Sequence, residues 1–483
     1  MKTPIPRPKK FLRADRTVPA AFVVTGFDPV FEPAVRVFRD YAFRAFGEAV
    51  NGSGQILLDL VPDLQDSYTI SVGDEIVVSA RDNVGMNHAF ATLLQLVEEQ
   101  DGALVLPRCE ISDTPDSDWR GLMVDLARCW HEAPYLFAVA DLCWLYKINR
   151  LQLHLTDDQG IRFPFRCFPE VVSAEHYTEE ELRSLIAYCS DRGVSLVPEI
   201  DAPGHARAFN TNYPAVFGTA PKQSSQNTTA QAAIVSGIMR ADEVTFDALN
   251  KIFTEVAEFF SDSPYIHIGG DEADIRKWDE CPVSVAYREA HGLKDVHELY
   301  GHYVARLCDM VIALGRTPVV WEGFAKECNH MVSKKALVFA WESYYQLAPD
   351  LLAGGFDIVN VAWKPLYVVP RAKKWDPEEI LDWEKNVWTH WWEKSVASVT
   401  PIEVSKNAPI HGGQMCVWGD KMQPTASWAK VATREEMIRE SYADLRYRLP
   451  ALAEKTWNSY NAPDKAAFMA DLQAQDALLE KIL

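Results

Sequence analysis

From residue 118 onward, short apolar runs alternate with longer segments in which apolar residues recur every three or four positions. The short runs predict buried strands and the longer segments predict helices. Strands are expected at residues 121–126, 150–155, 195–200, from 265 to the Gly269-Gly270 pair, and at 317–321, 336–341, 356–361 and 414–418. Helices are expected at 134–146, 178–191, 246–260 and 434–448, with a polar loop through residues 226–228 before the third. Eight strand-helix units predict an α/β fold of the (β/α)8 TIM-barrel type.

The first part of the chain has a different pattern. Two β-branched runs at 68–72 and 75–80 are joined by Gly73-Asp74, which is typical of a hairpin, and 85–99 has helical spacing. We interpret residues 1–115 as a small supporting α+β domain and residues 116–483 as the barrel, joined by a polar linker near 112–117. The tryptophan-rich stretch 368–409 is irregular and shows no clear period that would define a barrel helix.

Composition limits the possible partners. The 483 residues carry a net charge of -20, which argues against a nucleic-acid or anionic-membrane surface, because phosphate binding needs a basic face. The nine cysteines form no CxxC pair, and no apolar stretch reaches the length of a membrane span. We therefore expect a reduced, cytoplasmic protein with no cofactor. A removed leader sequence and a homodimer both stay open.

The stretch 265–272 carries the first candidate chemistry. Its strand stops at two glycines, which free the backbone so that Asp271 and Glu272 can turn toward one pocket. Two close carboxylates push their pKa values apart, and this can make one a proton donor while the other stays ionised. The plain alternative is a solvated acidic turn.

The other strand ends favour the pocket. In a barrel of this kind, catalytic groups lie where the strands end. The residues found there are Asp125, Arg128, Asp157, Asp158, Gln159, Glu199, Asp201, His205, Trp321, Trp341, Trp418 and Asp420. Aromatic faces suit the C–H face of a pyranose, and charged groups suit its hydroxyls. In the usual mechanism of glycosidic bond cleavage, a nucleophile and an acid lie on opposite sides of the bond, and two adjacent acids fit this arrangement poorly. This misfit points to a substrate-assisted variant of the mechanism.

Four motifs then identify a resemblance. They are RGLMVDLAR at 120–128, LHLTDDQG at 153–160, PEIDAPGH at 198–205 and HIGGDE at 267–272. In this order the chain resembles glycoside hydrolase family 20, the β-N-acetylhexosaminidases, over residues 116–457. Ala453, Glu454 and Trp457, expected just after the last helix, belong to the match.

The resemblance implies a retaining exo-hydrolase of terminal β-linked GlcNAc or GalNAc. The substrate's own 2-acetamido oxygen would attack the anomeric carbon and form an oxazolinium intermediate. Glu272 would be the general acid and base, and Asp271 would orient the acetamido N–H. The resemblance also implies that Arg128 and Asp420 bind sugar hydroxyls and that Tyr367 binds the acetamido carbonyl. The walls of the pocket would be formed by Trp321, Trp341 and Trp418. A relay behind Glu272 would consist of Asp157, His205 and Asp201.

One departure and several alternatives stay open. Many family members carry an Asp two residues after the pocket Tyr, where this chain has Val369, so a polar group from the stretch 383–392 is expected to replace it or the leaving-group side is more open. Arg128 alone could be a structural ion pair with Asp157. A divalent metal on Asp157, Asp158 and Asp201 is disfavoured because nothing fixes its ligand geometry. A lacto-N-biosidase and a catalytically silent sugar-binding barrel are the alternative functions.

Overall fold

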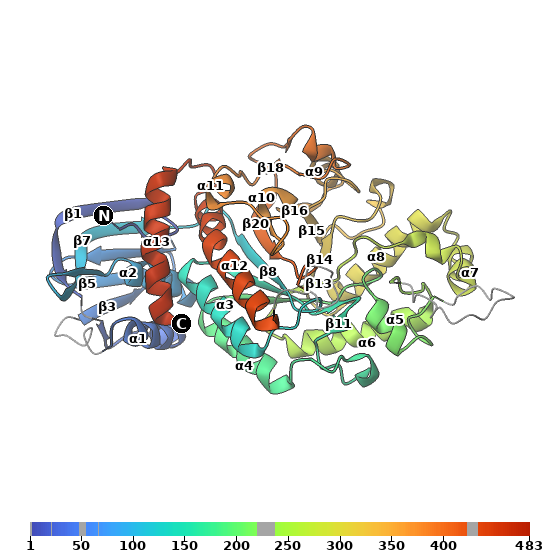
Figure 1. Ribbon diagram of the computed structural model, residues 1–483, viewed down its shortest axis with the longest axis horizontal. Coiled ribbons are helices and arrows are strands. Elements are labelled where there is room, and N and C mark those ends of the chain that lie inside the picture. Colours follow the sequence, from blue (N-terminus) through green and yellow to red (C-terminus); the bar gives the residue numbers. More distant parts are fainter. Residues whose placement is uncertain (1, 21, 48–54, 66, 220–236, 423–432) are drawn as a thin grey trace.

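The computed structural model describes residues 2–20, 22–47, 55–65, 67–219, 237–422 and 433–483. The polar loop expected at 226–228 lies outside the described residues. A small mixed sheet with its helices forms one end of the molecule, and a barrel forms the other (Figure 1).

The barrel contains the eight expected strands, and all of their pairings are parallel. They are β8 (Trp119–Asp125), β9 (Arg150–His154), β12 (Ser195–Glu199), β13 (Tyr265–His267), β14 (Thr317–Trp321), β15 (Leu337–Ala340), β16 (Asp357–Asn360) and β20 (Ile410–Val417). The pairing of β16 with β20 closes the ring. The TIM-barrel prediction is therefore confirmed, and the predicted strand ends differ from the observed ones by only a few residues.

Helices surround the strands, as the apolar periodicity predicts. They include α3 (Ala133–Leu145), α4 (Glu179–Asp191), α5 (Arg207–Asn212), α6 (Glu243–Phe259), α7 (Pro282–Ala290), α8 (Val296–Ala313), α9 (Ala348–Ala353) and α12 (Arg434–Trp457). Thr178 and Glu181 cap α4 reciprocally, which satisfies backbone N–H groups at its start.

The predicted end of the last barrel helix at residue 448 is wrong. Helix α12 continues through Pro450 to Trp457, so Ala453, Glu454 and Trp457 lie inside it and not after it. A proline inside a helix normally ends it. Here the residues beyond Pro450 are almost all buried, and this tertiary packing outweighs the local signal.

The tryptophan-rich segment forms only short elements. They are α10 (Trp363–Leu366), β17 (Tyr367–Val368), α11 (Pro377–Ile380), β18 (Val387–Trp388) and β19 (Ile402–Glu403). Strand β17 adds to the barrel beside β20, and Lys364 bridges Thr389. The segment therefore folds back on itself next to the strand ends.

The N-terminal sheet has the order β1-β7-β4-β5-β3-β2, with β6 paired to β7. The bounds are β1 (Lys10–Pro19), β2 (Val23–Val24), β3 (Gln55–Leu60), β4 (Tyr68–Val72), β5 (Ile76–Ala80), β6 (Glu98–Gln100) and β7 (Ala103–Asp113), with helices α1 (Glu32–Phe46) and α2 (Asn83–Gln95). The hairpin of β4 and β5 is confirmed. The helix expected to reach residue 99 ends at Gln95, because the chain turns there into β6, and β7 takes up the first part of the expected linker.

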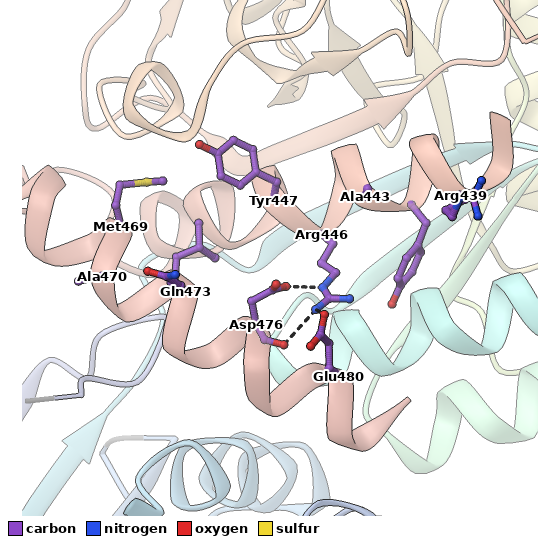
Figure 2. A pocket seen from close by; sticks show the side chains of 11 residues that line it. Arg439, Ala443, Arg446, Tyr447, Met469, Ala470, Gln473, Asp476 and Glu480 are labelled. Carbon is purple, nitrogen blue, oxygen red and sulfur yellow. Dashed lines mark hydrogen bonds and ion pairs between the residues drawn. The ribbon is translucent and has the colours of Figure 1, made fainter. Parts of the chain in front are cut away.

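The C-terminal helix α13 (Lys465–Ile482) was not predicted, and it lies against α1 and α12 (Figure 1). A hollow of about 810 Å³ lies between residues 439–447 of α12 and residues 469–480 of α13 (Figure 2). Arg446 in this hollow pairs with Asp476 and, at 3.0 Å, with Glu480. The two carboxylates of the hollow, Asp476 and Glu480, are thus already matched. No helix among the described residues is long and apolar enough to cross a membrane.

Candidate active site

The paired carboxylates leave β13 as the sequence predicts. Gly269 and Gly270 have φ values of +71° and +88°, a conformation that side-chain-bearing residues rarely adopt. A Cβ atom at Gly269 would also lie 1.8 Å from Oδ1 of Asp201. Glu272 itself has a φ of +45°. The strained turn brings both Asp271 and Glu272 to the same pocket.

Arg128, which follows β8, is held by carboxylates. Its Nη1 donates to Asp125 at 3.1 Å and its Nη2 lies 2.8 Å from Asp157. Its Nε lies 3.6 Å from Oδ1 of Asp420, and its guanidinium lies 4.8 Å from the ring centre of Trp418. The structural ion pair with Asp157 therefore exists, but Arg128 also lines the pocket. The binding of sugar hydroxyls by Arg128 stays a prediction.

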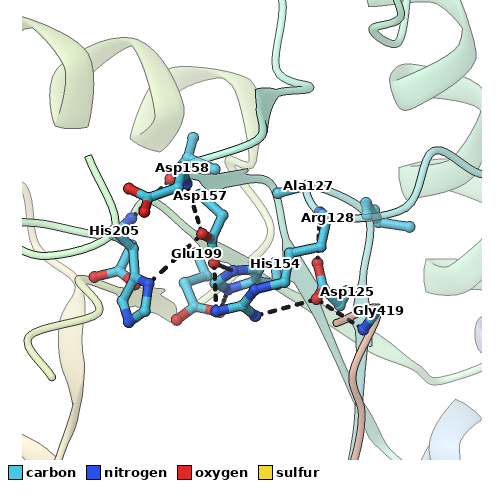
Figure 3. Close-up of polar contacts among 12 residues, drawn as sticks. Asp125, Ala127, Arg128, His154, Asp157, Asp158, Glu199, His205 and Gly419 are labelled. Carbon is cyan, nitrogen blue, oxygen red and sulfur yellow. Dashed lines mark hydrogen bonds and ion pairs between the residues drawn. The ribbon is translucent and has the colours of Figure 1, made fainter. Parts of the chain in front are cut away.

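A chain of imidazole and carboxylate groups leads away from Glu272, and Figure 3 shows the part of it from His205 to Glu199. Nε2 of His205 lies 3.4 Å from Glu272, and Nδ1 of His205 lies 3.5 Å from Asp157. His154 then joins Asp157, at 2.9 Å, to Glu199, at 2.7 Å. The predicted placement of Asp157 and His205 behind Glu272 is thus observed, and the chain continues through two residues that had no predicted role in it.

Asp201 lies beside this chain. Its backbone N–H donates to Thr156 at 2.9 Å, and its Oδ1 accepts a hydrogen bond from the backbone N–H of Gly270 at 3.3 Å. Asp201 therefore supports the turn that presents the two carboxylates.

The aromatic residues form a continuous wall. The rings of Trp341 and Tyr367 are stacked at 6.1 Å with an angle of 6° between their planes. Trp418 lies 6.0 Å from Trp321 and 5.9 Å from Tyr367. Nε1 of Trp321 donates to Glu199 at 2.7 Å, which fixes that ring. All four predicted aromatic residues are brought together, although Trp321 lies behind the others and is not part of the cavity lining.

The cavity has a volume of about 290 Å³. It is lined by Arg128, Asp271, Glu272, Trp341, Glu342, Trp363, Tyr367, His390, Trp391, Trp392, Trp418 and Asp420. Oδ1 of Asp271, the hydroxyl of Tyr367 and Nε1 of Trp418 are buried without a hydrogen-bond partner among the described residues. Buried polar atoms are nearly always paired, so these three suit a polar ligand.

Five lining residues were not predicted individually: Glu342, Trp363, His390, Trp391 and Trp392. His390, a polar residue of the stretch 383–392, lines the pocket. That it replaces the family Asp stays a prediction. Val369, at the position of the family Asp, is buried among aromatic and aliphatic side chains.

Burial and charge separate the ionisation of the two acids. Burial, and secondarily the charge of Glu272, raise the pKa of Asp271 to about 7. The hydrogen bond from His205 lowers the pKa of Glu272. For His205, burial opposes the charged form, but the carboxylate of Asp157 outweighs it and the pKa is raised well above its ordinary value. In the unliganded site the proton therefore favours Asp271 over Glu272.

The side chains of Asp201, His205 and Asp271 offer ligand atoms within 4.8 Å of one another. They fit a metal ion poorly, because both nitrogens of His205 face carboxylates and carry protons. Burial also raises the pKa of Asp201 well above its ordinary value, which favours the neutral carboxyl over the carboxylate that a metal ion needs. The arrangement is suited to moving protons.

Comparison with known proteins agrees with this geometry. Residues 118–459 match the model of the glycosyl hydrolase family 20 catalytic domain. The chain belongs to glycosyl hydrolase family 20. The resemblance stated from the four motifs is therefore confirmed, and the match covers the barrel, its strand ends and the cavity described above.

Family 20 relatives share part of their length with this chain. It is 32% identical to the β-hexosaminidase of Vibrio furnissii over 379 residues, which are 73% of this chain and 59% of that protein. It is 34% identical to the β-hexosaminidase of Akkermansia muciniphila over 288 residues, or 55% of this chain and 58% of the relative. The matches thus span less than two thirds of either relative.

Solved structures show the same fold over the whole chain. The exo-β-N-acetylglucosaminidase of Vibrio harveyi, solved with N-acetylglucosamine, has a TM-score of 0.78 at 24% identity and covers 100% of this chain and 78% of its own. The chitobiase of Flavobacterium johnsoniae has a TM-score of 0.78 at 25% identity and covers 99% of this chain and 72% of its own.

Proposed function

We propose that this protein is an exo-acting β-N-acetylhexosaminidase that removes terminal β-linked GlcNAc or GalNAc with retention of configuration. One observation carries the proposal: both neighbouring carboxylates, Asp271 and Glu272, lie within 4 Å of the same nitrogen of His205 in a pocket walled by aromatic rings. Two acids on one side of a pocket cannot straddle a glycosidic bond as nucleophile and acid. The substrate's acetamido oxygen supplies the nucleophile instead.

Each group then has a defined task. Glu272 protonates the leaving oxygen and later removes a proton from the attacking water. Asp271 accepts the acetamido N–H through its unpaired buried oxygen and balances the positive charge of the oxazolinium. The hydroxyl of Tyr367, buried without a partner among the described residues, donates to the acetamido carbonyl.

The roles require the proton to move from Asp271 to Glu272 when substrate binds. Glu272 is half-exposed in the free protein, with 50% of its side chain open to solvent. A sugar ring that fills the pocket removes this water and raises the pKa of Glu272, because burial disfavours the charged form. The acetamido N–H stabilises the carboxylate of Asp271 and lowers its pKa. Both changes act in the required direction.

The test is the Glu272→Gln variant with a para-nitrophenyl β-GlcNAc substrate. Loss of the proton donor is expected to reduce turnover by about 10²-fold or more. Glu280→Gln makes the same change at an exposed position on the surface and serves as the control. Turnover near the wild-type rate in pure Glu272→Gln protein would rule the proposal out.

The alternatives predict different products. A lacto-N-biosidase releases a disaccharide and needs a wider pocket, whereas a cavity of about 290 Å³ is at the small end for ligand sites and favours one sugar. Product analysis on a tetrasaccharide separates the two. A silent sugar-binding barrel would bind without cleaving, and the presence of both carboxylates weighs against it.

A further inference from the structure

Glu342 and His390 form a polar pair in the wall of the cavity. Nδ1 of His390 accepts hydrogen bonds from the backbone N–H groups of Trp391 and Trp392, at 2.9 and 2.8 Å. Its hydrogen is therefore on Nε2, which lies 3.4 Å from Oε2 of Glu342. The hydroxyl of Ser395 donates a hydrogen bond to the backbone carbonyl of Glu342 at 2.7 Å and so holds the backbone of Glu342. The carboxylate is fixed in place.

This geometry leaves Glu342 with its charge. A histidine whose Nδ1 accepts two hydrogen bonds is neutral, so His390 satisfies one oxygen of the carboxylate without cancelling its charge. Within the described parts of the chain, Glu342 has no other ion-pair partner than His390. Only 9% of its side chain is exposed, and it faces the cavity. A buried charge of this kind favours a ligand that brings hydrogen-bond donors or a positive charge.

Glu342 lines the same cavity as the candidate proton donor Glu272. Exposed aromatic residues follow each member of the polar pair in the sequence: Tyr344 and Tyr345 come after Glu342, and Trp391 comes after His390. Among the residues that line the cavity, the arginine Arg128 is already held by Asp125 and Asp157. Outside the lining, Nζ of Lys373 lies 4.5 Å from the ring centre of Trp391, and Nζ of Lys394 lies 5.6 Å from that of Trp392.

An aromatic rim continues outward from this wall. Tyr344, Tyr345 and Trp391 are 51%, 36% and 42% exposed, which is unusual for such large rings. Tyr344 lies 5.4 Å from Trp392, and Trp391 lies 5.5 Å from Trp363 inside the cavity. Exposed aromatic faces next to a sugar pocket suit a further pyranose ring.

We propose that Glu342, positioned by His390, binds the sugar that leaves, with the rim of Tyr344, Tyr345, Trp391 and Trp392 as its platform. The carboxylate accepts hydrogen bonds from hydroxyl or ammonium groups of that sugar and repels a carboxylate on it. The site thus selects neutral and cationic leaving sugars, such as glucosamine, over acidic ones. This inference rests on the proposed glycosidase function.

The test compares three disaccharides with a non-reducing β-linked GlcNAc: one ends in GlcNAc, one in glucosamine and one in glucuronic acid. The wild-type protein is expected to show a kcat/KM at least tenfold higher for the glucosamine disaccharide than for the glucuronic acid disaccharide. In Glu342→Gln this ratio is expected to fall to about threefold or less, because the amide keeps the shape and removes the charge. Glu393→Gln, an exposed change on the neighbouring segment, controls for overall charge.

An unchanged ratio in Glu342→Gln would overturn the assignment. If that variant does not fold, the wild-type protein still gives an answer. It is expected to cleave the glucosamine disaccharide with a higher kcat/KM than the GlcNAc disaccharide, because only glucosamine brings an ammonium group to the buried carboxylate. Equal kcat/KM values for these two disaccharides would contradict the role of Glu342. Failure of the underlying function is distinguishable, since the protein would then not cleave even the para-nitrophenyl β-GlcNAc substrate.

Discussion

Nε2 of His205 lies 3.4 Å from Oε2 of Glu272, while the other nitrogen of the same ring lies 3.5 Å from Asp157. The imidazole thus bridges the candidate proton donor and a fully buried carboxylate. Because Asp157 keeps His205 charged, the ring holds the pKa of Glu272 below its usual value in the free protein. The bridge sets how readily Glu272 takes up the proton that it must donate.

Replacement of His205 by Gln is expected to change the pH profile as well as the rate. Without the imidazolium, the pKa of Glu272 rises, so Glu272 stays protonated to higher pH and the basic limb of the kcat/KM profile moves upward. We also expect kcat to fall by about 10- to 100-fold, the usual effect of losing a supporting hydrogen-bond partner at an active site. His330→Gln, an exposed change, is the control. A lower rate with an unmoved basic limb would show that His205 only supports the fold.

Asp271→Asn tests the orienting carboxylate. An amide cannot balance the charge of the oxazolinium, and we expect kcat on para-nitrophenyl β-GlcNAc to fall by about 10²- to 10³-fold, as for the loss of other charge-stabilising groups. A thiazoline mimic of the oxazoline should inhibit the wild-type protein strongly and the variant weakly. Equal inhibition of both would contradict a contact between Asp271 and the acetamido group.

The strand ends were predictable because each buried strand is a short apolar run, and the barrel places the residues after these runs on one rim. This rule places four residues on the rim from the sequence alone: Asp271, Glu272, Arg128 and His205. The glycines before Asp271 were an additional signal, since a turn with positive φ favours them.

Glu342 directly follows the strand predicted at 336–341, so the same rule reaches its position, but His390 could not be found in this way. His390 lies in a stretch with no helical or strand period, and its contact with Glu342 spans 48 residues. Only tertiary folding of the tryptophan-rich segment brings them together. The C-terminal end of α12 could not be predicted from the sequence either, because buried contacts after Pro450 outweigh the proline's tendency to end the helix.

Asp113→Ala is expected to destabilise the junction between the small domain and the barrel. Asp113 accepts hydrogen bonds from Tyr68 and Trp457 and lies 3.3 Å from Nζ of Lys147, whose side chain is fully buried. Removal of the carboxylate leaves a buried cation without its partner, which costs about 3–5 kcal/mol. The free energy of unfolding in urea measures this loss. Asp74→Ala, at an exposed ion pair, should cost less than about 1 kcal/mol, and a similar loss in both variants would contradict the role of the junction.

Stability should also depend on pH through His411, at the opposite end of the barrel from the cavity. Its Nδ1 lies 3.0 Å from Asp118 and its Nε2 lies 3.2 Å from Asp357, and the hydrogen bond to Asp118 is the main cause of its raised pKa. Because the folded-state pKa exceeds the unfolded value of about 6.5, the stabilisation is fully present below that pH. It is lost as the pH rises through the folded-state pKa.

The size of this effect is limited by solvent, since about a third of the His411 side chain is exposed. We expect a contribution of about 0.2–1 kcal/mol, as for other partly exposed ion pairs. Urea unfolding of the wild-type protein and of His411→Gln at pH 5.5 and pH 9 measures it. The difference in unfolding free energy between the two proteins should be larger at pH 5.5, because only there is the imidazolium fully formed between its two carboxylates. A difference that grows toward pH 9 would mean that His411 is neutral in the folded protein.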